Sequence, residues 1–143
     1  MLDSSYTFER FSSIPQNYED ILLKGISENA YEMRGLQPFN PFSVFIKDSM
    51  QQVVGGVLGV TFYGSLYVDS LWIDKTLRKK GLGTLLMQEV EKLAIVNQAR
   101  FITLNTMDFE GLNFYQKLGF TIEFIREGYD KDSKMYLLRK QLI

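Results

Sequence analysis

The segment between residues 66–73 and residues 81–97 has the composition of an anion-binding turn. It combines cations with two glycines and reads Asp74-Lys75-Thr76-Leu77-Arg78-Lys79-Lys80-Gly81-Leu82-Gly83-Thr84. A helix start leaves backbone N–H groups unpaired and carries partial positive charge. Gly81 and Gly83 lack side chains, so a phosphate can approach this backbone closely. The sequence therefore predicts a site for an anionic diphosphate ligand. The cations beside it are Lys75, Arg78, Lys79 and Lys80.

Two nucleotide-binding motifs and a plain helix start are the alternatives for this turn. A Walker loop needs Gly-Lys-Ser/Thr after a longer glycine loop, which is absent. A dinucleotide fingerprint needs three glycines near the first strand and an acidic residue about 20 positions later. Here the two glycines follow a series of strands expected to be antiparallel. Taken alone, an ordinary helix start with a solvated basic cluster explains the turn equally well.

The composition excludes several kinds of chemistry. There is no Cys and no His among the 143 residues, so thiol nucleophiles, disulfides, histidine bases and histidine metal sites are excluded. We expect no metal to be needed. The formal net charge of −1 argues against nucleic acid as a partner. The N-terminus lacks the pattern of a signal peptide, and no apolar run approaches the ~20 residues of a membrane span. We therefore expect no membrane partner and a cytoplasmic protein.

Hydrophobic periodicity and turn residues predict the elements that must position this turn. Apolar stripes predict helices at residues 17–34, 81–97 and 108–118. Asp108 is predicted as the N-cap of the last helix and Gly119 as its left-handed end. Strands are predicted at residues 6–11, 42–48, 53–63, 66–73, 100–104, 121–125 and 135–138.

The order of these elements predicts one α/β domain spanning residues 1–143. Strands that follow one another closely are expected to pair antiparallel. Residues 66–104 read as strand, helix and strand, a βαβ crossover. We therefore expect a mixed, mostly antiparallel sheet with a central crossover and helices on both faces.

Two motifs resemble the GNAT superfamily of N-acetyltransferases. Arg78-Lys79-Lys80-Gly81-Leu82-Gly83 matches the signature Arg/Gln-x-x-Gly-x-Gly/Ala, and Asn113-Phe114-Tyr115-Gln116-Lys117-Leu118-Gly119-Phe120 is similar to a helix that follows the fifth strand of these enzymes. Their joint occurrence in order is specific. Residues 66–73 also resemble a strand of bacterial members, whereas the first 40 residues fit only by predicted structure.

The resemblance implies acetyl coenzyme A as co-substrate and assigns its contacts. The strand end Leu71-Trp72-Ile73 would offer backbone groups to the pantetheine arm, and the turn from Arg78 through Leu82 to Thr84 would hold the pyrophosphate. The strands at residues 66–73 and 100–104 would separate to admit the thioester. Tyr115 would stand near the coenzyme sulfur as general acid. The superfamily often has Asn where this chain has Asp108. The resemblance is also compatible with a homodimer.

Acetyl transfer to a primary amine by direct attack needs a base, an oriented acceptor and a proton for the thiolate. Tyr115 can supply that proton, although a tyrosine on a helix stripe can also be a core residue. Asp69 is a candidate base because an unpaired carboxylate inside an apolar strand would be costly. A salt-bridged or solvent-facing Asp69 is an equal alternative. Asn105 either orients substrate or caps a turn, and Trp72 and Tyr67 are interpreted as packing residues.

The sequence supports two classes of function. The first is an active N-acetyltransferase acting on a small-molecule amine or a protein amine. The alternative is a catalytically idle module that senses acyl coenzyme A. The presence of both glycines and Tyr115 favours the enzyme. Carboxylates at Asp69, Asp108 and Glu110 hint at a cationic acceptor such as a polyamine or an aminoglycoside.

Overall fold

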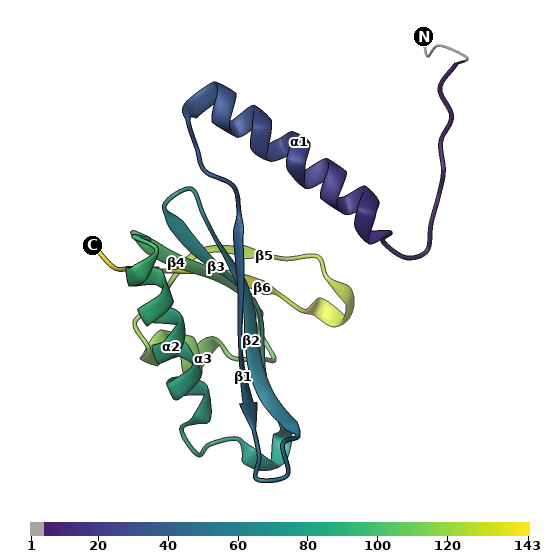
Figure 1. Cartoon of the computed structure of the whole chain (residues 1–143). Helices are drawn as coiled ribbons and strands as arrows, with labels where there is room; N and C mark the ends of the chain where they lie inside the picture. Colours follow the sequence, from purple (N-terminus) through teal and green to yellow (C-terminus); the bar gives the residue numbers. More distant parts are fainter. Residues whose placement is uncertain (1–4) are drawn as a thin grey trace. The chain divides into compact units, whose positions relative to one another are not determined.

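The structure, a computed structural model, describes residues 5–143. The chain forms two compact units, one of residues up to Pro38 and one of Phe39–Ile143. The elements, in chain order, are α1 (Gln16–Arg34), β1 (Asn40–Lys47), β2 (Val53–Phe62), β3 (Ser65–Ile73), η1 (Lys75–Leu77), α2 (Leu82–Val96), β4 (Phe101–Met107), α3 (Leu112–Lys117), β5 (Thr121–Arg126), η2 (Asp130–Asp132) and β6 (Met135–Gln141) (Figure 1).

The first unit contains the long helix α1. Gly35 ends this helix with φ of 66°, and the N–H groups of Gly35 and Leu36 donate to the carbonyls of Tyr31 and Ala30. The prediction of a helix over residues 17–34 is confirmed. The prediction of a strand at residues 6–11 is wrong, because this stretch has no regular structure. A strand needs a partner, and the described part of this unit, residues 5–38, contains no other strand.

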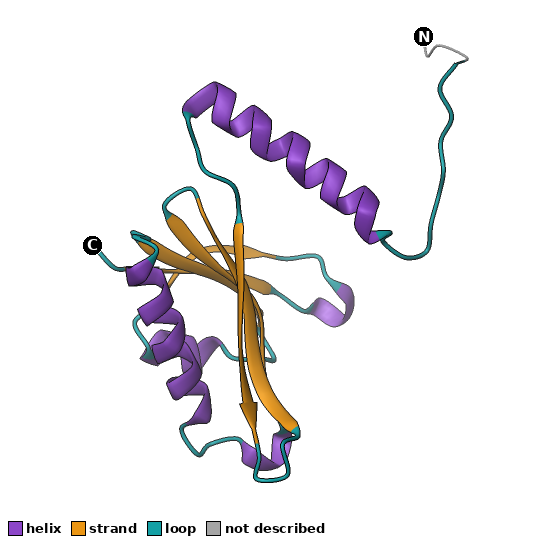
Figure 2. Cartoon of the chain, in the orientation of Figure 1, coloured by secondary structure: helices purple, strands orange, loops and turns teal. Residues whose placement is uncertain are grey.

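The second unit is built on a six-stranded sheet with the order β1-β2-β3-β4-β6-β5. Only β3 and β4 pair parallel, and α2 connects them; all other neighbours pair antiparallel. The predicted mixed sheet with a central βαβ crossover is therefore confirmed. Figure 2 shows α2 and α3 lying on the same face of this sheet. None of the described helices is long and apolar enough to span a membrane.

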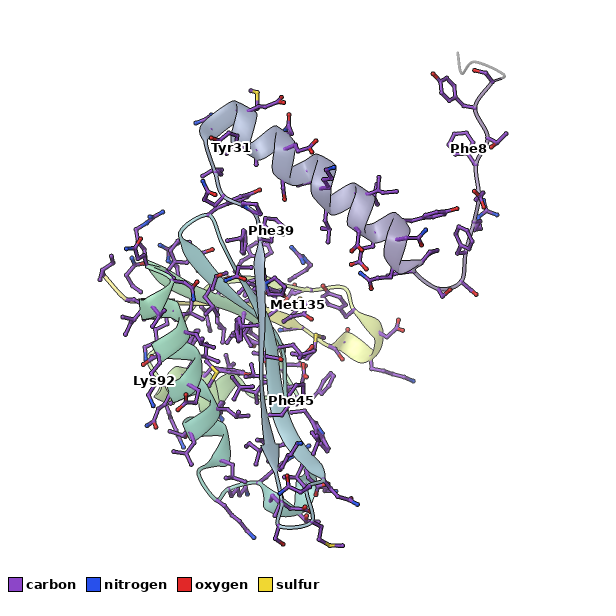
Figure 3. All side chains as sticks on the ribbon, in the orientation of Figure 1. Phe8, Tyr31, Phe39, Phe45, Lys92 and Met135 are labelled. Carbon is purple, nitrogen blue, oxygen red and sulfur yellow. The ribbon has the colours of Figure 1, made fainter. Side chains whose placement is uncertain are left out.

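The core of the second unit lies between the sheet and these two helices. Alternate strand residues point to it, and Val57, Leu66 and Ile102 are fully buried there. From the helices, buried side chains such as Leu86 and Val90 close the same core. The opposite face of the sheet carries residues such as Phe45, which projects away from α2 in Figure 3.

The edge strand β5 is irregular. Its pairing with β6 shifts register between Ile122 and Phe124, and every residue of the strand is exposed. Glu123 lies in this shift, and its carboxylate pairs with Arg139 at 3.8 Å.

Candidate functional site

The predicted anion-binding turn forms the start of α2. Gly81 is the N-cap residue, with φ of 84° and no side chain to cap the helix. The first backbone bond of the helix runs from Leu85 N–H to the Gly81 carbonyl at 3.1 Å. The N–H groups of Leu82, Gly83 and Thr84 have no acceptor among the described residues. These donors, together with the partial positive charge of the helix end, can hold an anion.

The two glycines of the turn have different structural roles. A Cβ atom placed on Gly81 would have no neighbour within 4 Å, so the space in front of it is open. A Cβ atom on Gly83 would lie 3.1 Å from Cζ of Phe114 on α3. The small size of Gly83 therefore also lets α3 pack against α2. Sequence reasoning attributed Gly83 to phosphate approach alone and missed Phe114, which lies inside the second motif.

The cations around the turn are also not equivalent. The Arg78 Nε–H donates to the Ile73 carbonyl at 3.0 Å, which ties the turn to the end of β3. Lys75, Lys79 and Lys80 are exposed and form no ion pair with any described residue. These three lysines are therefore fully available to a ligand, whereas Arg78 can offer only the guanidinium donors that its bond to Ile73 does not use.

Asp74, which begins the same loop, is already engaged. Its carboxylate accepts from the Thr76 hydroxyl at 2.6 Å and from the Thr76 N–H at 2.9 Å. These hydrogen bonds hold the pKa of the Asp74 carboxyl below its usual range, and the bond from the Thr76 hydroxyl has the larger effect. Asp74 therefore shapes the loop and stays ionised.

The strands β3 and β4 separate next to this turn. Their parallel pairing covers only Ser65–Val68 with Phe101–Leu104. Beyond it, β3 stays paired with β2 as far as Ile73, and β4 stays paired with β6 as far as Met107. Residues 69–73 of β3 therefore have no partner on β4. The resemblance implied this separation, and it leaves the edge of β3 from Asp69 to Ile73 without a strand partner on the side of β4, where the Ile73 carbonyl accepts from Arg78.

A β-bulge places Asp69 at the point where the strands part. Leu58 pairs with Ser70 and Gly59 with Val68, so Asp69 has no partner on β2. Its side chain is exposed and accepts from the Ser70 hydroxyl at 3.3 Å. The expectation that Asp69 is a costly carboxylate inside an apolar strand is therefore wrong in its premise, because water reaches it.

Tyr67 and Asn105 lie on the two sides of the same separation. The Asn105 amide Nδ2 donates to the Tyr67 hydroxyl at 3.5 Å, a long contact. Partial burial, and then the charge of Asp69, raises the pKa of the Tyr67 phenol. Because β4 continues to Met107, Asn105 lies within the strand and does not cap its end, and its side chain is exposed. Tyr67, Asp69 and Asn105 thus form one polar group beside the gap.

Tyr115 of α3 has a buried ring and a hydroxyl without a partner. The residue is 8% exposed, and its ring meets Phe114 and Phe120 edge to face. Burial, with a smaller effect of the Glu110 carboxylate, raises the pKa of the Tyr115 phenol to about 12. Every fully buried side-chain oxygen of the described residues forms a hydrogen bond, whereas the Tyr115 hydroxyl forms no hydrogen bond with a described residue. The hydroxyl must therefore reach an accessible point, protonated and free to donate.

Asp108 does not begin the last helix, so that prediction is wrong. Residues after β4 first make a turn, α3 starts at Leu112, and Gly111 is its N-cap residue. The Glu110 carboxylate accepts from the Met107 N–H at 2.8 Å, and the Asp108 N–H donates to the Lys134 carbonyl at 2.9 Å. Gly119, with φ of 96°, follows the helix in the left-handed region as predicted.

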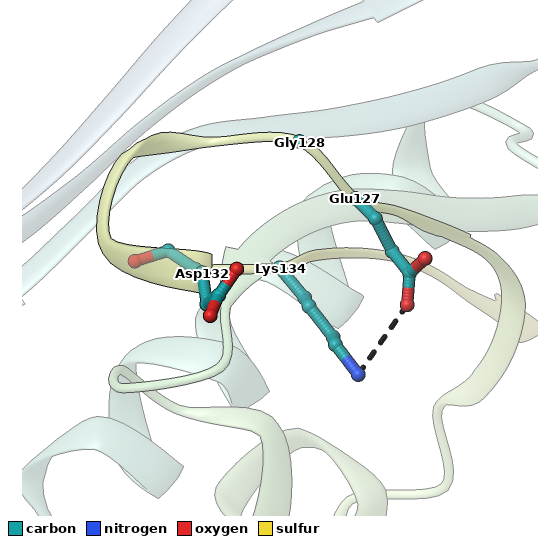
Figure 4. A pocket seen from close by; sticks show the side chains of 5 residues that line it. Glu127, Gly128, Asp132 and Lys134 are labelled. Carbon is teal, nitrogen blue, oxygen red and sulfur yellow. Dashed lines mark ion pairs between the residues drawn. The ribbon is translucent and has the colours of Figure 1, made fainter.

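Two further features were not foreseen. Trp72 is 53% exposed, so its interpretation as a packing residue is wrong. The loop between β5 and β6 encloses an open hollow of about 600 Å³ lined by Glu127, Gly128, Asp132, Ser133 and Lys134 (Figure 4). The Glu127 carboxylate and the Lys134 ammonium pair there at 3.3 Å. Among residues 5–143 no group of carboxylates is arranged to hold a metal ion.

The comparisons with known proteins agree with this geometry. The Acetyltransferase (GNAT) family matches residues 8–120. The chain belongs to this family. It is 28% identical to a blasticidin-S acetyltransferase from Streptomyces morookaense, over 74% of this chain and 79% of that protein. The GNAT fold and an acyltransferase activity therefore stand on both the sequence and the structure.

Solved structures of GNAT acetyltransferases share the fold. A crystal structure of an acetyltransferase from Bacillus cereus superposes with a TM-score of 0.77 at 27% identity, covering 94% of this chain and 98% of that chain. A protein from Bacillus anthracis, assigned as a streptothricin acetyltransferase and solved with acetyl coenzyme A, has a TM-score of 0.65 at 20% identity. This match covers 73% of this chain and 64% of that chain.

Proposed function

We propose that this GNAT protein transfers the acetyl group of acetyl coenzyme A to a primary amine by direct attack, as one acetyltransferase domain spanning the chain. The observation that carries the proposal is the separation of β3 and β4 beside a helix start with free N–H groups. The helix start suits a diphosphate, and the free strand edge suits an amide-containing arm, which are the two parts of coenzyme A.

The coenzyme would be held mainly by backbone groups. The N–H groups of Leu82, Gly83 and Thr84 would bind the pyrophosphate, and the unpaired lysines would add long-range attraction. Leu71, Trp72 and Ile73 would hydrogen-bond the pantetheine arm as a short added strand. A coenzyme held in this way places its thioester in the gap, between Tyr115 and the polar group of Tyr67, Asp69 and Asn105.

The reaction follows from the groups around that gap. An amine with a pKa of about 10 arrives mostly as an ammonium ion, and the exposed Asp69 carboxylate can attract it and accept its proton, directly or through water. The neutral nitrogen then attacks the thioester carbon, the C–N bond forms and the C–S bond breaks. Asn105 would orient the amine. The Tyr115 hydroxyl donates to the departing thiolate, so no covalent enzyme intermediate is needed.

The acceptor is proposed to be a small cationic amine. The exposed Asp69 carboxylate has no cationic partner among residues 5–143, so a cationic amine can pair with it. The relative from Streptomyces is named for the acetylation of blasticidin S. A small-molecule acceptor is therefore favoured over a protein amine.

Calorimetric titration with acetyl coenzyme A tests the binding site. Lys79→Gln combined with Lys80→Gln should weaken binding about 10-fold, since each removed cation near a phosphate costs roughly 0.5–1 kcal/mol. Lys92→Gln is the matched control, because Lys92 lies ten residues along the same helix, about 15 Å from its start. Undiminished binding in the double variant would place the pyrophosphate elsewhere.

Release of free thiol in the presence of amines tests turnover. Wild-type protein should release coenzyme A faster with an amine than without one, and the acetylated amine should appear in equal amount by mass spectrometry. Coenzyme binding without any amine-dependent release would instead indicate an acyl-coenzyme A sensor.

A further inference from the structure

Two aromatic side chains lie in one row on the face of the sheet that α2 and α3 do not cover. Phe45 of β1 pairs with Gly56 of β2, and Gly56 pairs with Trp72 of β3. Their strand neighbours Val44, Ile46, Leu71 and Ile73 pack into the core, so Phe45 and Trp72 point to the opposite face. Each of the two is 53% exposed.

Gly56 leaves room for the Phe45 ring on this face of the sheet. A Cβ atom on Gly56 would lie 2.6 Å from Cδ1 of Phe45, so the Phe45 ring lies directly over this glycine. Any larger residue at this position would displace the Phe45 ring. We name Phe45, Gly56 and Trp72 the aromatic row. Leu58, in the adjacent row beside Ser70, is 41% exposed and extends the apolar surface toward Asp69.

The aromatic row ends close to the unpaired carboxylate. Asp69 precedes Trp72 by three residues on β3, a distance of about 10 Å along a strand. Asp69 and Ser70 both lie at the bulge, beside the separation of β3 and β4. One surface therefore presents a free carboxylate at the reaction gap and exposed aromatic rings about 10 Å away.

We infer that the acceptor is an amine joined to a planar aromatic or heteroaromatic ring, with the ammonium group at Asp69 and the ring on the aromatic row. This inference rests on the proposed function and names its substrate class. Charge complementarity selects the cation, because Asp69 has no positive partner among residues 5–143. Ring stacking and burial of apolar area select the planar group. Phe45 and Trp72 are thereby specificity-determining residues.

Trp72 is the only tryptophan of the chain, so its fluorescence reports directly on this surface. The test titrates phenylbutylamine and cyclohexylbutylamine into the protein saturated with coenzyme A. The two amines share charge and length, but only the first has a planar ring. Phenylbutylamine should change the Trp72 emission with saturation and bind about fivefold more tightly, the factor expected of one aromatic contact.

Variants locate the two halves of the surface. Phe45→Ala should remove most of the fivefold preference for the planar ring, while Asp69→Asn should weaken both amines. Phe124→Ala is the matched control, because this phenylalanine is 55% exposed on β5, at the other edge of the sheet. In turnover, Trp72→Leu should raise KM for phenylbutylamine and bring the ratio of kcat/KM for the two amines close to one.

The outcomes separate this inference from the proposed function. Saturable emission changes that prefer the planar ring and depend on Phe45 support the inference. Equal binding of the two amines, absence of any emission change, or an equal effect of Phe124→Ala overturns it. Calorimetry on the same samples shows whether acetyl coenzyme A binds. If it binds and alkylamines are acetylated without ring preference, the inference fails and the proposed function stands; if it does not bind, the proposed function fails.

Discussion

The two faces of the sheet are made from alternate residues of the same strands, yet they differ in burial. On the side of α2 and α3, Leu66 and Ile102 are completely buried. On the other side, Phe45 and Trp72 are each 53% exposed. The strand period of two lets one short segment serve both purposes. The helix side supplies stability, and in the proposed function the other side supplies binding groups beside the separation of β3 and β4.

The largest expected effect tests the helix side. Leu66→Ala should lower the free energy of unfolding by about 2–5 kcal/mol, because it opens a cavity in a fully packed core. Leu58→Ala on β2 is the matched control, and since Leu58 is 41% exposed its cost should stay below about 1 kcal/mol. Urea denaturation measures both. Equal costs would mean that the two faces are not as different as their burial indicates.

Tyr115→Phe tests whether a residue of the helix side takes part in chemistry. We expect kcat to fall about 100-fold, the low end for loss of a general acid, because a thiolate is a tolerable leaving group. Coenzyme affinity and the melting temperature should change little, since the ring and its contacts with Phe114 and Phe120 remain. A variant with the wild-type rate, while chemistry limits turnover, would make Tyr115 a core residue alone.

The raised pKa of Tyr115 predicts how stability depends on alkaline pH. Burial favours the protonated phenol, so its pKa rises from 10.0 in a free tyrosine to about 12 in the folded chain. Between these values the folded state holds more protons than the unfolded state, and stability falls as pH rises. The loss from this group is at most about 2.7 kcal/mol. Between pH 9 and about 12, the free energy of unfolding measured by denaturation should fall more steeply with pH for wild type than for Tyr115→Phe.

A smaller effect separates the two glycines of the turn. Gly81→Ala should cost about 1 kcal/mol because φ of 84° is strained for any residue with a side chain. Gly83→Ala has a helical backbone but meets Phe114 at 3.1 Å. Gly83→Ala should therefore be less destabilising, by about 0.5–1 kcal/mol in the free energy of unfolding, in a Phe114→Leu background than in wild type. A double-mutant cycle by thermal denaturation measures this coupling, and additive effects would show that α2 and α3 do not touch there.

The smallest expected effect is that of metal removal. A chain without Cys or His offers a transition metal only oxygen donors, which suit Mg or Ca better. Exhaustive treatment with a chelator should leave the rate of thiol release unchanged with either phenylbutylamine or cyclohexylbutylamine as acceptor. A loss that zinc or iron specifically restores would contradict this expectation.

Elements with strong local signals could be predicted from the sequence. The stripe Leu82, Leu86, Val90 and Ala94 predicts α2, and the structure places it within one or two residues. The strands of the second unit were found for the same reason. The predicted strand at residues 6–11 is absent, and local composition could not show this, because a strand depends on a partner elsewhere in the chain.

The site was harder to predict than the fold. Asp69 follows Val68, which points to the core, so the strand period of two already directs Asp69 to the exposed face, and the bulge then turns Leu71 and Ile73 to the core. A bulge depends on the pairing of two strands, so one strand's sequence does not disclose it. Asp108 resembles an N-cap, yet Glu110 and Lys134 instead bind the backbone around it. The signal that could have revealed the aromatic row was Gly56, a glycine in the middle of an apolar strand.

The irregular edge strand β5 has a consequence for solubility at high concentration. Ile122, Phe124 and Ile125 are all exposed on a strand with an open edge, a combination that favours pairing with another chain. The register shift at Glu123 interrupts that edge, and its charge would be buried by any flat, continuous pairing. We therefore expect Glu123 to oppose aggregation, so replacing this carboxylate with valine should favour pairing between chains while leaving the gap between β3 and β4 unchanged.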